Sequence, residues 1–232
     1  MQLDSRKLIQ KSVMRVLFYS IALTAMTYLI LFDASIIRHN NLFSENSLTE
    51  ITQIIFLSCI VVLLLIDGMK NSGRQTVSFF LMAAFLCALI REMDSSFDAV
   101  FDGAWQLSVC VVIAALVPWL YQRKDRFFTE LSAFITSPAF GILFCGFLTV
   151  MVFSRFFGRE VLWVEIMGDG FIRSVKNVVE EGVELFGYYL CLIACFEYFL
   201  LPDFNKSSKE HHNAILKNNS VLNEKPEVEA FV

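Results

Sequence analysis

Three glutamates within five residues are the sharpest chemical feature of this sequence. Glu180, Glu181 and Glu184 stand at spacings of three and four in an otherwise apolar stretch. Residues three and four apart share one side of an α-helix, so the three carboxylates can line a single face. Carboxylates this close repel one another, and we expect an arginine or a cation to neutralise them. Arg91 and Arg155 are the arginines predicted to lie at the same depth.

Further charged residues occur at the ends of the neighbouring apolar stretches. An ionisable group inside a membrane usually faces the bundle interior, a partner or a water-filled cavity. This favours proton- or cation-coupled transport, or the binding of a solute. The plainer alternative places Glu180 and Glu181 among lipid headgroups at a helix N-terminus, where the macrodipole favours carboxylates, while the arginines extend to the surface. The candidate binding residues are Glu184, Glu180, Glu181, Arg91, Glu92, Arg155 and Glu50.

A second acidic group occupies the run REMDSSFDAVFDG. Asp94, Asp98 and Asp102 recur every four residues, so a continuous helix would align them into a stripe able to attract a divalent cation. This stripe is the metal-site candidate, although its spacing does not match an EF-hand loop and a solvated acidic loop is the alternative. Asp33 and Asp67 are interpreted as ordinary residues at the ends of spans.

The residues that many membrane enzymes need are scarce. Histidine occurs only at positions 39, 211 and 212, outside the predicted spans, which argues against zinc hydrolases and paired-His haem sites. Nucleophile-elbow, Walker A and dinucleotide-binding motifs do not occur in a suitable context. The six cysteines fall inside apolar runs and are interpreted as packing residues. An enzymatic role is therefore less favoured than a non-catalytic one, and no cofactor is identified apart from the candidate divalent cation.

The elements that must position these groups are predicted to be membrane helices. Hydrophobic residues make up 56% of the 232 residues, with 24 Phe, and the mean hydropathy is +0.59. A spanning helix needs about 20 mostly apolar residues, because its backbone polar groups must be paired within the segment. We therefore predict an all-α, polytopic bundle of six transmembrane helices at Val13–Phe32, Ile51–Ile66, Thr76–Ile90, Ala104–Tyr121, Ser137–Phe153 and Arg173–Leu201.

The distribution of basic residues predicts the orientation of the bundle. Most Lys and Arg lie in the two ends of the chain and in the second and fourth connections, which the positive-inside rule places in the cytoplasm. Both termini are then cytoplasmic. The predicted parts are an N-terminal segment at 1–12, the six-helix domain at 13–202 and a disordered tail at 203–232. The segments at 127–136 and 161–167 are predicted to lie flat on the membrane.

Several short segments together resemble a known group of proteins. The segments EITQ at 50–53, REMD at 91–94, SPAF at 137–140, FSR at 153–155 and EEGVELFG at 180–187 resemble the pattern of uncharacterised bacterial multi-pass inner-membrane proteins. The resemblance extends over residues 45–201. It implies location in the bacterial inner (plasma) membrane and brings no activity with it.

Three classes of function remain open from the sequence. The first is a transport or solute-binding protein that uses the carboxylates and arginines. The second is an accessory or assembly subunit, which pairs with a membrane protein partner or forms a homo-oligomer. The third is a metal-dependent, lipid-modifying enzyme that uses the aspartate stripe. The net charge of −4 indicates no nucleic-acid partner, and the lipid bilayer is the expected surrounding.

Overall fold

A computed structural model of the chain describes residues 2–40 and 47–201. For residues 2–5, 8 and 36–40 it describes the backbone alone. Within these ranges the structure contains helices and no strand. The helical elements are α1 (Gln2–Asn40), α2 (Leu48–Lys70), α3 (Gln75–Glu92), α4 (Asp94–Asp98), α5 (Ala104–Tyr121), α6 (Lys124–Ile135), α7 (Pro138–Leu148), a π-helical segment (Thr149–Ser154), α8 (Arg155–Phe157), α9 (Glu160–Met167), a 3-10 turn (Gly168–Gly170) and α10 (Arg173–Leu200).

Six helical segments are long and apolar enough to cross a membrane, which confirms the predicted number of apolar helices. They correspond one to one with the predicted spans, but the bounds differ. The first helix is the clearest case, because α1 already begins at Gln2 and includes the predicted N-terminal segment. The fifth span continues through the π-helical segment as far as Phe157. The predicted tail at 203–232 lies outside the described residues.

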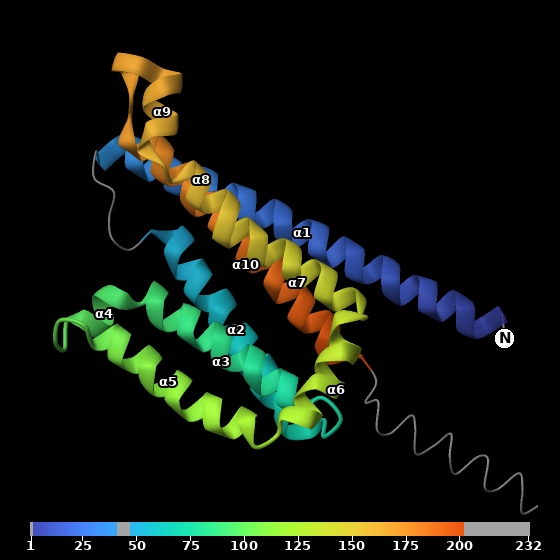
Figure 1. The fold of residues 1–232 in the computed structure, drawn as a ribbon. Helices are drawn as coiled ribbons and strands as arrows, with labels where there is room; N and C mark the ends of the chain where they lie inside the picture. Colours follow the sequence, from blue (N-terminus) through green and yellow to red (C-terminus); the bar gives the residue numbers. More distant parts are fainter. Residues whose placement is uncertain (1, 41–46, 202–232) are drawn as a thin grey trace, which may run out of the picture.

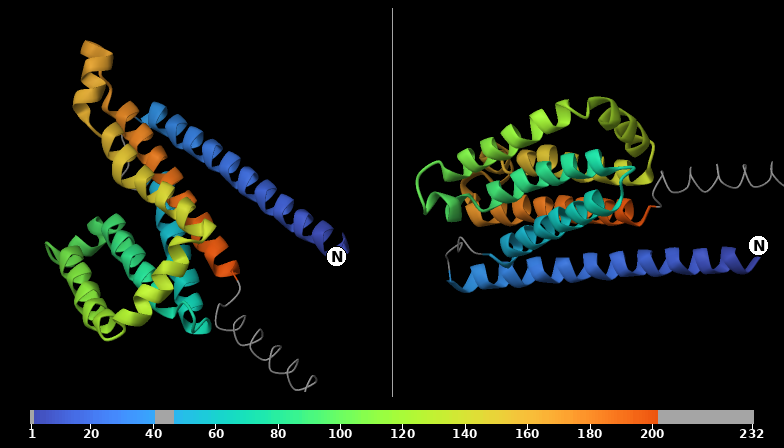
Figure 2. Two further views of the ribbon diagram at one scale, coloured as in Figure 1. Left: turned by 45° about the vertical axis from the view of Figure 1, so that its right-hand side comes forward. Right: turned by 90° about the horizontal axis from the view of Figure 1, so that it is seen from below.

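Helix α10 occupies the centre of the bundle (Figure 1). It packs against α2, α7 and the π-helical segment, and more loosely against α1. Half of its most apolar window is buried, compared with 6% for α5, which places α10 inside and α5 at the edge. Figure 2 shows α1 running along one side of the bundle and α5 along another. The six spans alternate in direction, so Gln2 and Leu200 lie at the same end.

Two glycines allow α7 and α10 to cross in close contact. A Cβ atom placed on Gly187 would lie 2.5 Å from Cγ2 of Val150 and 3.0 Å from the carbonyl oxygen of Gly146. A Cβ on Gly146 would lie 2.8 Å from the carbonyl oxygen of Gly187. Neither position can take a larger side chain without a shift of its neighbour, and small residues serve the same purpose in many membrane bundles. A Cβ placed on Gly182, in contrast, would lie 3.6 Å from Cδ1 of Ile30, which is an ordinary van der Waals contact.

Carboxylates from neighbouring helices hold the N-termini of α2 and α3. Oδ2 of Asp33 accepts hydrogen bonds from the backbone N–H and the hydroxyl of Thr49, at 2.7 and 2.6 Å. Oε2 of Glu130 accepts from the N–H groups of Thr76 and Val77, at 2.6 and 3.0 Å. The first N–H groups of a helix have no partner within it, so these side chains satisfy donors that would otherwise stay unpaired.

Arg74 provides hydrogen-bond donors for the C-terminal carbonyl groups of α10. Its guanidinium donates to the carbonyl oxygens of Tyr198 and Phe199, at 2.7 and 3.1 Å, and forms an ion pair with Asp67 at 2.7 Å. Asp67 and Asp33 are 0% and 8% exposed. The interpretation of these two aspartates as ordinary residues at span ends was therefore wrong, because both belong to buried networks that connect helices.

Short helices occur where flat surface segments were predicted. The segment at 127–136 is part of α6, which joins α5 to α7 across one end of the bundle (Figure 1). The segment at 161–167 is part of α9, whose residues are exposed or half-buried. Their position flat on the membrane stays a prediction. We call the end of the bundle near α6 the Arg74 end, and the end near α9 the Glu184 end.

Candidate functional site

Glu184 lies within α10, one of the six helices long and apolar enough to cross a membrane, and is 8% exposed. Its Oε1 accepts a hydrogen bond from the Ser154 hydroxyl at 2.8 Å and forms an ion pair with Arg155 at 2.8 Å. Both contacts come from the segment that continues α7. A buried charge is tolerated when it is paired and hydrogen-bonded, and Glu184 satisfies both conditions.

Glu180 lies one helical turn away and is held by two cations. Its carboxylate is 2.9 Å from Lys176, four residues earlier on α10, and 3.7 Å from Arg155. Arg155 therefore bridges Glu180 and Glu184. We call Glu180, Glu184, Arg155, Lys176 and Ser154 the carboxylate cluster. Arg155 is 43% exposed at its side chain, so the cluster is open to its surroundings on one side.

The π-helical segment explains why Ser154 and Arg155 face α10. It spans Thr149–Ser154, directly after the glycine crossing of α7 with α10. An inserted residue of this kind rotates the side chains that follow it, and such segments are frequent at functional sites. Gly158 adds to the fit, because a Cβ at this position would lie 2.3 Å from Oε1 of Glu180. The close approach of the chain at Gly158 therefore helps to position the Glu180 carboxylate.

Glu92 joins this region through a tyrosine. The Tyr188 hydroxyl donates to Oε1 of Glu92 at 2.8 Å, and Tyr188 follows Glu184 by one turn on α10. This hydrogen bond places Glu92 within about one helical turn of Glu184 along α10. The sequence predicted both glutamates as candidates, but it gave no indication that Tyr188 connects them.

Glu181 forms no ion pair with a described residue. The carboxylates that act most strongly on its side chain are Glu50 of α2 and Glu184 of α10. The amide of Gln53 on α2 donates to the Glu181 backbone oxygen at 3.1 Å, which holds this part of α10 against α2. Glu180 and Glu184 both pair with Arg155. The alignment of all three glutamates on one face stays a prediction.

Arg91 is placed apart from the ion pairs. Its side chain forms no hydrogen bond or ion pair with any residue that the structure describes. Arg155 is therefore the arginine that pairs with Glu184. Arg91 instead lines an apolar cavity of about 570 Å³, to which Tyr188 also contributes. The carboxylate cluster and this cavity thus adjoin each other at Tyr188.

The aspartate stripe is interrupted in the structure. Helix α4 ends at Asp98, and the chain turns before α5 at Gly103, whose φ is +87°. Asp94 accepts from the N–H of Ser95 and Asp98 accepts from the N–H of Gly103. Asp102 follows in the turn and is exposed. Over residues 2–40 and 47–201, no three Asp, Glu, His or Cys side chains form a group suited to a metal ion. The divalent-cation site stays a prediction.

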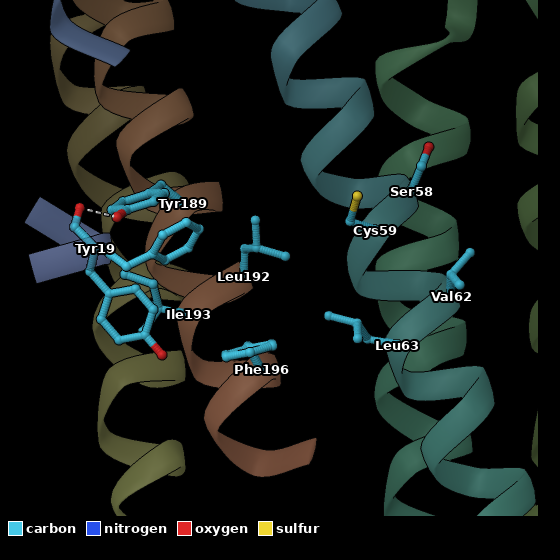
Figure 3. Close-up of a pocket in the computed structure, with 10 residues that line it drawn as sticks. Tyr19, Ser58, Cys59, Val62, Leu63, Tyr189, Leu192, Ile193 and Phe196 are labelled. Atoms are coloured by element: carbon cyan, nitrogen blue, oxygen red, sulfur yellow. Dashed lines mark hydrogen bonds between the residues drawn. The ribbon is translucent and has the colours of Figure 1, made fainter. Parts of the chain in front are cut away.

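A second apolar cavity, of about 540 Å³, lies between α1, α2 and α10. Figure 3 shows Tyr189, Leu192 and Phe196 on one side of it and residues of α2 on the other. The Tyr189 hydroxyl donates to the backbone oxygen of Tyr19, which connects α10 to α1. At the Arg74 end, the Glu197 carboxylate binds Arg15 and the Tyr19 hydroxyl, each at 2.6 Å. These contacts attach the peripheral α1 to the bundle.

Part of this arrangement could have been found in the sequence. Lys176 and Glu180 are four residues apart, a spacing at which opposite charges pair on a helix. Tyr188 is four residues after Glu184, on the same helix face. Ser154 gave no signal beyond its place next to Arg155.

Comparison with protein-family models, with curated proteins and with solved structures found no match.

Proposed function

We propose that this integral membrane protein is a proton- or cation-coupled carrier or solute-binding protein, in which Glu184 is the coupling residue. The observation that carries the proposal is the position of Glu184. It is a buried carboxylate within a membrane span, paired with an arginine that also contacts a second carboxylate. Ionisable residues at such positions usually serve ion or substrate pathways, because an idle charge there is costly.

The balance of charge around α10 supports this role. Glu180, Glu181 and Glu184 contribute three carboxylates, and among the described residues only two cations, Arg155 and Lys176, form ion pairs with them. A proton or a monovalent cation can neutralise the carboxylate that remains. Exchange of this cation would alter the ion pair of Arg155 with Glu184, which connects α7 to α10. Cation binding and helix packing would thereby be coupled.

The experiment uses the full-length protein in vesicles with an enclosed pH-sensitive dye. A potassium gradient with valinomycin sets the membrane potential, and the proton flux is measured with and without external sodium. We expect the wild-type flux to exceed that of protein-free vesicles. The change Glu184→Gln removes the titratable group but keeps the side-chain size, so the flux should fall to the protein-free level.

The matched control is Glu165→Gln, which removes an exposed carboxylate on α9 and should leave the flux unchanged. Size-exclusion profiles of both variants exclude a folding defect as the cause of a lost flux. Equal fluxes from wild-type and protein-free vesicles would contradict the carrier role. So would a folded Glu184→Gln variant with wild-type flux.

A second candidate is an accessory subunit that pairs with another membrane protein. The observation that favours it is the saturation of Glu184 and Glu180 by Ser154, Arg155 and Lys176, as expected for groups that hold helices together. Purification in mild detergent from the native membrane tests this role. A partner recovered in fixed proportion supports the subunit role, and isolation as a single species in repeated preparations counts against it.

The cellular location and orientation are also proposals. The basic residues at the Arg74 end, among them Lys70, Arg74 and Lys124, support a cytoplasmic position for that end and for both termini in a bacterial inner membrane. A reporter fused after Val232 that is active only in the cytoplasm tests the orientation. An inactive reporter on a correctly inserted protein would reverse it.

A further inference from the structure

The cavity next to Arg91 lies between α5 on one side and α7 and α10 on the other. Helix α5 packs against α3, α4 and α6, and among the described elements it makes no contact with α7 or α10. Figure 2 shows α3 and α5 set apart from α7 on this side of the bundle. Ala84 and Ala88 of α3 face the space, and their small side chains leave it wide. The result is a cavity of about 570 Å³, a size typical of ligand sites.

The walls of this cavity suit a hydrocarbon chain. Phenylalanines from α6 and α7, including Phe134, Phe144 and Phe147, form much of the lining. Leu131 and Phe134 of α6 contribute at the Arg74 end, because α6 crosses the bundle there. Apolar surfaces of this kind bind the apolar part of a ligand, while a few polar groups fix its orientation.

The polar groups of the cavity lie at the Glu184 end. Arg91 is exposed and has no ion-pair or hydrogen-bond partner in the described part of the chain. The carboxylates closest to it in sequence are engaged elsewhere, since Glu92 accepts from Tyr188 and Asp94 accepts from the N–H of Ser95. Trp105 lies in the same wall at the start of α5, a position typical of tryptophan at headgroup depth.

We propose that this cavity binds one acyl chain of an anionic phospholipid of the surrounding bilayer, with the lipid phosphate held by Arg91. A guanidinium offers two parallel N–H donors that match phosphate oxygens, and basic pockets between transmembrane helices bind anionic headgroups. The charge of Arg91 thus selects an anionic lipid over a zwitterionic one. The proposal concerns residues outside the carboxylate cluster and does not depend on the coupling role of Glu184.

The test measures quenching of Trp105 fluorescence by lipids with brominated acyl chains. The full-length protein carries Trp119→Phe and Trp163→Phe, so that Trp105 is its single tryptophan. It is placed in nanodiscs of equal parts phosphatidylglycerol and phosphatidylcholine, with bromine on one or the other lipid. We expect brominated phosphatidylglycerol to quench Trp105 more strongly, with a preference of about tenfold, the size typical of one charged hydrogen-bonded contact.

Two variants and their controls decide the outcome. Arg91→Gln should remove the preference for phosphatidylglycerol, whereas Arg159→Gln, at another exposed and unpaired arginine, should leave it unchanged. Ala84→Phe fills the cavity and should reduce quenching by both lipids, whereas Ala115→Phe, on the exposed face of α5 outside the cavity lining, should not. If Arg91→Gln does not fold, Arg91→Lys replaces it and should weaken the preference.

The results that overturn the proposal are equally definite. Equal quenching by the two lipids in the wild-type background would exclude selection by charge. A preference that persists in folded Arg91→Gln protein would remove Arg91 from the site. If Ala84→Phe lowers quenching while Arg91→Gln changes nothing, the cavity binds a neutral amphiphile, and the anionic lipid is excluded.

Discussion

Arg74 and Asp67 form an ion pair of 2.7 Å in which the two side chains are 2% and 1% exposed. The pair connects three helices, because Asp67 lies in the last turn of α2, Arg74 directly precedes α3, and the guanidinium binds carbonyl groups in the last turn of α10. Asp67 also accepts from the Ser78 hydroxyl at 2.6 Å and from the Asn71 amide at 2.7 Å. The Arg74 guanidinium also lies over the Tyr198 ring, with Cζ 4.9 Å from the ring centroid, and forms a cation–π interaction.

The first prediction concerns this pair. Arg74→Met should lower the free energy of unfolding by about 3 kcal/mol or more, because Asp67 is left as a buried charge without its cation. The double change Arg74→Met with Asp67→Asn should be less destabilising than Arg74→Met alone. Unfolding in mixed micelles with increasing dodecyl sulfate measures both values. If the loss of unfolding free energy in the double variant equals the sum of the losses in the two single variants, the pair contributes no coupling energy.

The second prediction concerns the Glu130 cap. Glu130→Ala removes the acceptor for the N–H groups of Thr76 and Val77, so it should lower the free energy of unfolding by about 1 to 2 kcal/mol. Hydrogen exchange should increase at the first turn of α3. Asp125→Ala, an exposed position on the same helix, is the control and should change stability by about 0.5 kcal/mol or less. Similar losses of unfolding free energy from both variants would show that the Glu130 cap contributes no more to stability than an exposed residue does.

The helices could be predicted from the sequence, but the side chains that cap them could not. The apolar runs predicted six helices because the membrane requires about 20 apolar residues for each span. Glu130 and Asp33 could not be recognised in the same way. Each binds a residue 54 or 16 positions away in the chain, Thr76 in the first turn of α3 and Thr49 in the first turn of α2. Such contacts depend on how helices pack, and a single sequence carries no direct signal of that packing.

The third prediction uses three glycines of α7 and α10. Gly187→Ala should destabilise the bundle by about 1 to 3 kcal/mol, because the new Cβ overlaps Val150 and approaches the Gly146 backbone. Gly141→Ala is the matched control on α7, where no atom lies within 4 Å of the new Cβ. That change should be neutral or stabilising by up to about 1 kcal/mol, since alanine favours a helix over glycine. Equal effects from both alanines would contradict the close crossing.

In the candidate site, residue spacing along the sequence predicts some contacts, and helix packing determines the others. The i, i+4 spacing correctly relates Glu180 to Lys176 and to Glu184 along α10. The packing of α10 against α2 decides that Gln53 binds the Glu181 backbone, and the π-helical segment decides that Arg155 reaches Glu184. Neither follows from hydrophobic periodicity. The assignment of Arg91 to a cavity also required the structure, because the cavity exists through the separation of α5 from α7.

The fourth prediction tests whether Arg155 and Glu184 act as a pair. Arg155→Gln should lower the free energy of unfolding by about 1 to 3 kcal/mol, because Glu184 would then be buried with only the Ser154 hydroxyl as its partner. Adding Glu184→Gln should recover part of this loss, since the unpaired charge is removed and the amide oxygen can still accept from Ser154. The four proteins of this double-mutant cycle are compared by the same dodecyl sulfate titration.

Arg159→Gln is the control for the cycle, because Arg159 is exposed and forms no ion pair with the described residues. We expect it to change stability by about 0.5 kcal/mol or less. If Arg155→Gln is as mild as Arg159→Gln, the contact seen at 2.8 Å contributes nothing to folding. A coupling energy of about 1 kcal/mol or more would instead show that Glu184 is stabilised by Arg155 in the bundle. Neutralising Glu184 would then weaken the contact between α7 and α10, which is the link that cation-coupled transport requires.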